Sequence, residues 1–97
     1  MAAFQGKIVL FGGETVDNTW MPLGDTWTWD GTDWTEVTPS VSPSSRSWAA
    51  MAGTEDGVVL FGGQGRHGDT WVWDGASWTQ RDVPGPSPRS GAAMAAF

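Results

Sequence analysis

The chain has 97 residues, a net charge of −6 and no cysteine, so it holds at most one ordinary domain and excludes disulfide and thiol chemistry. Acidic residues outnumber basic ones by 11 to 5, which argues against nucleic-acid binding, because that function needs a basic face. Leu, Ile, Val and Phe make up less than a fifth of the chain, but its eight tryptophans replace much of the missing aliphatic core, since each buries roughly 150–250 Å².

The first half of the chain predicts three short β-strands after an N-terminal tail. Ile8–Gly13 has four apolar residues followed by a glycine pair, which is typical of a buried strand and a turn. Indole and small side chains alternate in Asp25–Trp29, which predicts a strand with one aromatic face. An Asp-Gly turn and an outer strand at Trp34–Val37 follow. We interpret Met1–Phe4 as the tail of an alanine-rich strand and Glu14–Leu23 as a long loop.

The second half repeats these elements, and a complete first strand precedes them. Arg46–Ala52, rich in small residues, predicts that strand. Val58–Gly63 then repeats the aliphatic strand of the first half at a separation of 50 residues. Asp69–Trp73 and Trp78–Asp82 repeat the two tryptophan-containing strands at a separation of 44 residues. After a Pro-rich crossing, Arg89–Phe97 begins the pattern a third time.

Each unit is therefore predicted to be four short antiparallel strands, an all-β architecture typical of one β-propeller blade. The double glycine, the tryptophan-rich strand and the arginine before the small-residue strand resemble the kelch repeat, and the resemblance covers nearly the whole chain. One departure is that the aromatic positions are almost all Trp, with no Tyr. We assign residues 1–45 to a first kelch blade, residues 46–88 to a second, and residues 89–97 to an inner strand for a neighbouring chain.

The ends of the chain predict self-assembly. Arg89–Phe97 joined to Gln5–Gly13 gives 18 residues that align with Arg46–Gly63, so the C-terminal strand is what the first blade lacks. Two blades cannot close a propeller and would expose strand edges and apolar faces. We therefore expect a head-to-tail ring, a six-bladed homotrimer or, as the alternative, an eight-bladed homotetramer. The residues expected to carry this assembly are Arg89, Ser90, Ala92, Met94, Phe97, Ile8 and Leu10.

Two copies of the same four residues compete for one place in this ring. Met1–Phe4 and Met94–Phe97 are identical, and we expect the C-terminal copy to pair because it continues Arg89–Ala93. The N-terminal copy would then be displaced towards the channel or the surface. The near-symmetry of the two halves suggests an engineered protein or a piece of a longer propeller.

The sequence favours neither catalysis nor a cofactor. His67 is the only histidine, and no second His or Cys is available as a metal ligand, although ring symmetry would gather one copy per subunit. Asp25, Asp30, Asp69 and Asp74 recur at equivalent positions, which favours capping of turns and strand ends over acid–base catalysis. Some kelch-bearing proteins resemble copper oxidases, whose chemistry uses Tyr, Cys and His ligands. This chain has no Tyr, no Cys and one His, so we expect no enzyme.

A candidate ligand face remains. Arg46 and Arg89 either tie adjacent blades by hydrogen bonds or form a ring of guanidinium groups that would hold a small anion bidentately. Trp20 and Trp48 lack counterparts, since Gly91 aligns with Trp48, and are candidates for stacking on a sugar. The whole candidate face comprises Arg46, Arg89, Ser47, Ser90, Trp20, Trp48 and His67.

The function expected from these patterns is self-assembly, with the protein itself as partner and with neither nucleic acid nor membrane involved. The alternatives are a lectin-like or acidic-peptide-binding propeller, or a fragment of a larger secreted enzyme. No apolar run is long enough to span a membrane, and Met1–Phe4 lacks the features of a signal peptide. We therefore expect a soluble chain whose compartment the sequence does not reveal.

Overall fold

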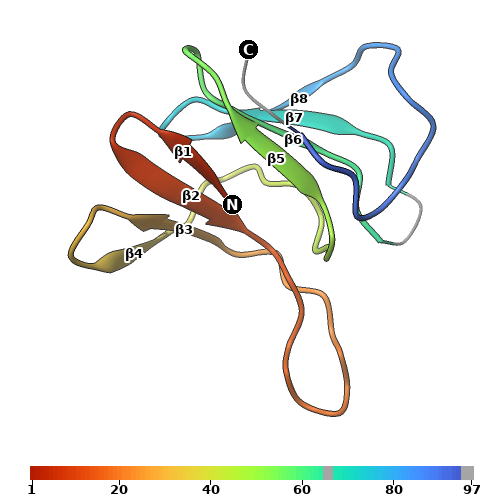
Figure 1. Ribbon diagram of the computed structural model, residues 1–97, viewed down its shortest axis with the longest axis horizontal. Helices are drawn as coiled ribbons and strands as arrows, with labels where there is room; N and C mark the ends of the chain where they lie inside the picture. Colours follow the sequence, from red (N-terminus) through yellow and green to blue (C-terminus); the bar gives the residue numbers. More distant parts are fainter. Residues whose placement is uncertain (65–66, 95–97) are drawn as a thin grey trace.

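The computed structural model describes residues 1–64 and 67–94, which form two four-stranded antiparallel sheets and no helix (Figure 1). The N-terminal sheet contains β1 (Ala2–Phe4), β2 (Lys7–Phe11), β3 (Thr26–Trp29) and β4 (Trp34–Val37), and the C-terminal sheet contains β5 (Ala50–Gly53), β6 (Val58–Phe61), β7 (Thr70–Trp73) and β8 (Trp78–Arg81). Within each sheet, every strand pairs with the next one along the chain. The predicted all-β fold of two repeated four-stranded units is confirmed. Among the described residues there is no helix that could cross a membrane.

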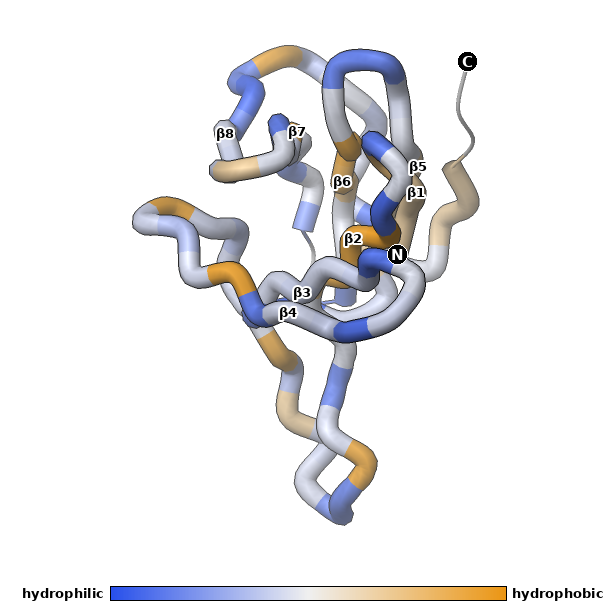
Figure 2. The backbone as a smooth tube through the Cα atoms, turned by 90° about the vertical axis from the view of Figure 1, so that its left-hand side faces the viewer, coloured by the Kyte–Doolittle hydropathy of each residue, from blue (hydrophilic) through white to orange (hydrophobic). Residues whose placement is uncertain are grey.

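The two sheets have the same register, so the sequence repeat is also a structural repeat. Leu10 lies opposite Trp27 in the N-terminal sheet, and Leu60 lies opposite Trp71 in the C-terminal sheet. Hydrophobic residues lie along the aliphatic strands β2 and β6 (Figure 2). The loop before β3 is longer in the first repeat and is closed by a single bridge between Glu14 and Pro22.

Aspartates cap the turns between the third and fourth strands, as the sequence predicts. The Asp30 carboxylate accepts hydrogen bonds from the backbone N–H groups of Thr32 and Asp33, each at 2.8 Å. Asp74 does the same in the second repeat, with two bonds of 2.9 Å. These bonds lower the pKa of both carboxyl groups, because they favour the charged form.

Each sheet has two chemically different faces, since directly opposed residues share a face. What we call the Trp face carries the indoles, and the Thr face carries threonines with aliphatic or aromatic residues. The Trp face includes Ile8, Leu10, Trp27, Trp29 and Trp34 in the N-terminal sheet, and Val58, Leu60, Trp71, Trp73 and Trp78 in the C-terminal sheet. The Thr face includes Val9, Phe11 and Thr26 in the former, and Val59, Phe61 and Thr70 in the latter.

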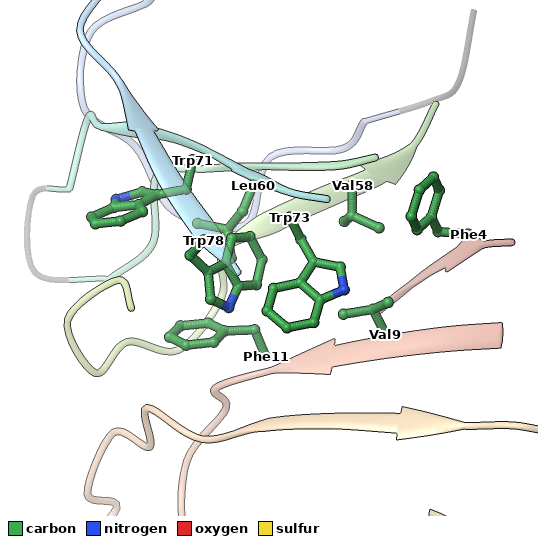
Figure 3. Packing of buried hydrophobic residues seen from close by; sticks show 8 residues of the cluster. All are labelled: Phe4, Val9, Phe11, Val58, Leu60, Trp71, Trp73 and Trp78. Carbon is green, nitrogen blue, oxygen red and sulfur yellow. The ribbon is translucent and has the colours of Figure 1, made fainter. Parts of the chain in front are cut away.

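The core forms where the Thr face of the N-terminal sheet packs against the Trp face of the C-terminal sheet. Figure 3 shows Val9 and Phe11 directed towards Trp73 and Trp78. The Phe11 and Trp78 rings make an edge-on contact with centroids 5.5 Å apart. The buried Trp78 Nε1–H donates a 3.0 Å hydrogen bond to Thr26 Oγ1 across the interface.

The first strands of the two sheets also approach one another. A Cβ atom added at Gly53 would lie 1.8 Å from the Ala3 carbonyl oxygen, so β5 has no room for a side chain where it passes β1. Figure 1 shows β1 and β5 side by side. This convergence of inner strands fits a β-propeller.

One expectation about the first strands is corrected, and another stays a prediction. In the single chain Ala2–Phe4 pairs with β2 through a two-residue turn, and the displacement of this copy by a neighbour's C-terminal segment in the ring stays a prediction. Gln5 and Gly6 in that turn both have positive φ, 51° and 73°, as a tight hairpin requires. The strand expected at Arg46–Ala52 begins only at Ala50, because Trp48 takes a left-handed conformation with φ 63°. Donation of residues 89–97 to a neighbouring chain stays a prediction, and Phe97 lies outside the described residues.

Candidate functional site

The junction between the two sheets is centred on Arg46, whose backbone is held by the N-terminal sheet. Gly13 N–H donates to the Arg46 carbonyl at 3.0 Å, and Arg46 N–H donates to the Leu23 carbonyl at 3.0 Å. A Cβ atom at Gly12 would lie 2.5 Å from the Arg46 carbonyl oxygen, and Gly12 has φ +70°. The double glycine therefore permits this close approach of two backbones.

The Arg46 side chain instead reaches into the C-terminal sheet. Its Nη1 donates to Asp69 Oδ1 at 2.6 Å and to the Gly62 carbonyl at 3.1 Å, while Nη2 donates to Asp69 Oδ2 at 2.9 Å. Nε and Nη2 also donate to the carbonyl and hydroxyl oxygens of Ser44, each at 3.1 Å. All five N–H donors of the guanidinium are thus used, and Arg46 is only 1% exposed.

This arrangement favours the blade-tie hypothesis for Arg46 over the anion-site hypothesis, because no donor is left for a ligand. The hydrogen bonds from Arg46, and a further one from Trp71 Nε1–H, lower the pKa of Asp69 from its ordinary 3.8 to about 2. The sequence suggested only a capping role for Asp69. In both repeats an aspartate directly precedes a Thr-Trp pair, and this recurrence indicates that the aspartate has a structural role. The sequence does not reveal which cation pairs with Asp69.

The backbone of Arg89 is held in the second repeat as the backbone of Arg46 is held in the first. Gly63 N–H donates to the Arg89 carbonyl at 2.9 Å, and Arg89 N–H donates to the His67 carbonyl at 3.3 Å. Its Nε and Nη2 donate to the carbonyl and hydroxyl oxygens of Ser87 at 3.0 and 2.9 Å. The Arg89 side chain is exposed, however, and its Nη1 has no hydrogen-bond partner among the described residues.

The remaining predicted ligand residues do not form one site. Ser47 is buried and donates to Gln64 Oε1 at 3.1 Å, whereas Ser90 is exposed. His67 is half-buried, and within residues 1–64 and 67–94 no cluster of three potential metal-ligating side chains exists. Trp48 is 62% exposed and does not line the pocket that contains Trp20.

Trp20 does lie beside polar groups. It is 61% exposed, has a left-handed backbone with φ 52°, and lines a pocket of about 330 Å³. The other residues that line this pocket are Glu14, Pro22, Ser47 and Gln64.

One Trp face and one Thr face lack a partner sheet in the single chain. On the Trp face of the N-terminal sheet, Ile8 and Leu10 are only half-buried, and Trp34 is 45% exposed. On the Thr face of the C-terminal sheet, Phe61 and Thr70 line a pocket of about 320 Å³ together with Arg89. Ala92 and Met94, which we expected to take part in assembly, line the same pocket. Of the predicted assembly residues, Ile8 and Leu10 thus lie on the free Trp face, and Arg89, Ala92 and Met94 lie beside the free Thr face.

No protein-family model and no curated protein matches the chain. The resemblance to kelch repeats stays a prediction.

Proposed function

We propose that this chain is a non-catalytic, kelch-type module that assembles with copies of itself, head to tail, into a closed β-propeller. In this ring the Thr face of one chain's C-terminal sheet packs on the Trp face of the next chain's N-terminal sheet. The observation that supports the proposal is the interface within the chain. It joins the Thr face of the N-terminal sheet to the Trp face of the C-terminal sheet, and it leaves the other Trp face and the other Thr face without a partner.

The residues on the two free faces repeat those of the internal interface. Trp78 packs against Phe11 and donates to Thr26 within the chain. Their counterparts are Trp34 on one free face and Phe61 with Thr70 on the other. A second copy would bring its Trp34 indole into the pocket beside Phe61 and Thr70, and the half-exposed indole would lose its contact with water. Six blades as a trimer are preferred, and eight as a tetramer are the alternative.

The mass of the native assembly tests this proposal. We expect the 10.4 kDa chain to form a trimer or a tetramer in native mass spectrometry. Trp34→Glu places a charge on the free Trp face and is expected to give monomers. Thr32→Glu, in the exposed turn after β3, is the matched control and is expected to leave the assembly intact. A monomeric wild-type chain would overturn the proposal.

The pocket at Trp20 supports a second candidate function, the binding of a neutral sugar. An exposed indole offers a stacking surface, and Glu14 with Gln64 offers hydrogen-bonding groups beside it. A screen of the chain against immobilised glycans is expected to yield binding that Trp20→Ala abolishes and Trp48→Ala retains. Trp48 is the matched control because it is equally exposed but does not line the pocket. Equal binding by both variants would exclude Trp20 as the platform.

A further inference from the structure

The N-terminal sheet contains an acceptor site that matches the one occupied by Arg46 in the C-terminal sheet. Trp27 Nε1–H donates to Asp25 Oδ2 at 2.6 Å, as Trp71 does to Asp69 Oδ2 at 2.7 Å. Gly12 N–H donates to the Asp25 carbonyl at 3.1 Å, and the equivalent bond of the C-terminal sheet measures 3.3 Å. Asp25 Oδ1 has no hydrogen-bond partner among the described residues. The carboxylate is therefore oriented as Asp69 is, but without an arginine.

Arg89 is the matching donor without an acceptor. Ser87 holds its Nε and Nη2 as Ser44 holds those of Arg46, so the guanidinium is oriented before any partner arrives. In Arg46 the groups that remain bind the carboxylate of Asp69 and the Gly62 carbonyl. In Arg89 the Nη1 donors have no partner in the described part of the chain.

The two halves of this arrangement do not meet within one chain. Arg89 lines the pocket on the free Thr face of the C-terminal sheet, whereas Asp25 directly precedes β3 of the N-terminal sheet, whose Trp face is free. The described residues contain one ion pair, that of Arg46 with Asp69. A head-to-tail neighbour would bring its own Asp25 to the place, relative to Arg89, that Asp69 occupies relative to Arg46.

We infer that Arg89 of each subunit forms a bidentate ion pair with Asp25 of the next subunit and donates a further hydrogen bond to that subunit's Gly12 carbonyl. This inference rests on the proposed head-to-tail ring and names the polar contact that closes each junction. The pair also sets the polarity of assembly, because a head-to-head contact would place like charges together, arginine on arginine or aspartate on aspartate.

A double-mutant cycle on the assembled protein tests the pair. Asp25→Asn keeps an oxygen that accepts the Trp27 hydrogen bond but removes the charge, and Arg89→Gln removes the guanidinium. Each single variant is expected to raise the dissociation constant between subunits by on the order of 100-fold in analytical ultracentrifugation. The combined variant is expected to dissociate about as readily as either single one, because both remove the same contact. Asp33→Asn, an exposed carboxylate in a turn, is the control and is expected to assemble like wild type.

The outcomes separate this inference from the proposed function. The ion pair would be overturned if the single variants dissociate like wild type, or if their effects on the dissociation constant multiply in the double variant. Either result would leave the proposed ring intact, provided that the wild-type chain is oligomeric. Arg89→Lys tests whether bidentate geometry is needed in addition to charge. A lysine keeps the positive charge but lacks the planar guanidinium that binds both carboxylate oxygens, so we expect this variant not to assemble like wild type. A wild-type chain that is monomeric would overturn both the ring and the pair. Far-UV circular dichroism of each variant at low concentration checks that the single chain is folded.

Discussion

The two sheets of this molecule have the same strand order, the same register and nearly the same side chains, yet they differ in burial. Trp78 in the C-terminal sheet is 2% exposed, whereas its counterpart Trp34 in the N-terminal sheet is 45% exposed. Leu60 is fully buried, and its counterpart Leu10 is not. The difference arises because only the C-terminal sheet has another sheet packed on its Trp face. A repeat therefore determines the shape of each unit, while the neighbour determines which of its residues form a core.

The largest expected difference between the sheets concerns these paired tryptophans. Trp78→Ala is expected to lower the free energy of unfolding by about 3–5 kcal/mol, because it leaves a cavity beside Phe11 and removes the bond to Thr26. Trp34→Ala is expected to cost only about 1 kcal/mol in the monomer, where the indole contacts Trp29 and water. Urea unfolding at concentrations that keep the chain monomeric measures both. Equal losses would show that the two faces are equally packed.

The two arginines give the next largest contrast. Arg46→Met leaves Asp69 without its cation and is expected to destabilise the monomer by about 3 kcal/mol. Arg89→Met, at an exposed side chain, is expected to change the same free energy by less than about 0.5 kcal/mol. Chemical denaturation of both variants under identical conditions provides the test. A large loss for Arg89→Met in the monomer would mean that its partner lies within its own chain.

The pKa of Asp69 gives a smaller, pH-dependent effect. Its carboxyl group has a pKa of about 2 in the folded chain against an ordinary value of 3.8, so the unfolded chain binds more protons between these two pH values. The stabilisation is complete above about pH 4 and is lost as the pH falls towards 2. Because the carboxylate is partly exposed, we expect a loss of about 1–2 kcal/mol.

Asp69→Asn is expected to remove this part of the acid dependence, and Asp25→Asn is expected to retain it in the monomer. Unfolding curves recorded between pH 5 and pH 2 compare the three chains. An unchanged acid dependence in Asp69→Asn would assign the effect to other carboxyl groups.

The smallest expected effect concerns one backbone position that the repeats fill differently. Trp48 and Gly91 both have positive φ, 63° and 68°, but only the glycine adopts this conformation without steric cost. Trp48→Gly is expected to stabilise the chain by about 0.5 kcal/mol, since the exposed indole loses little packing. Gly91→Ala is expected to destabilise it by about 1 kcal/mol. Thermal unfolding of both variants measures the difference, and a loss of stability in Trp48→Gly would reveal a packing role for the indole.

The sequence was sufficient for the features that depend on local pattern. Alternating tryptophans located β3 and β7, and the Asp-Gly pairs located the turns capped by Asp30 and Asp74, because strand periodicity and turn chemistry act over a few residues. The sequence was not sufficient where two segments compete or where a distant partner decides. The pairing of Ala2–Phe4 with β2 and the choice of Asp69 as partner of Arg46 both depend on which groups meet in space.

The two-residue turn between β1 and β2 has a kinetic consequence. A hairpin with such a short connection forms within about 1–10 μs, far faster than two chains meet at ordinary concentrations. Ala2–Phe4 is therefore paired with β2 before any neighbouring chain arrives. If the C-terminal segment of a neighbour is to replace it, the hairpin must first open, and ring formation would then proceed at the rate of that opening rather than at the rate of collision.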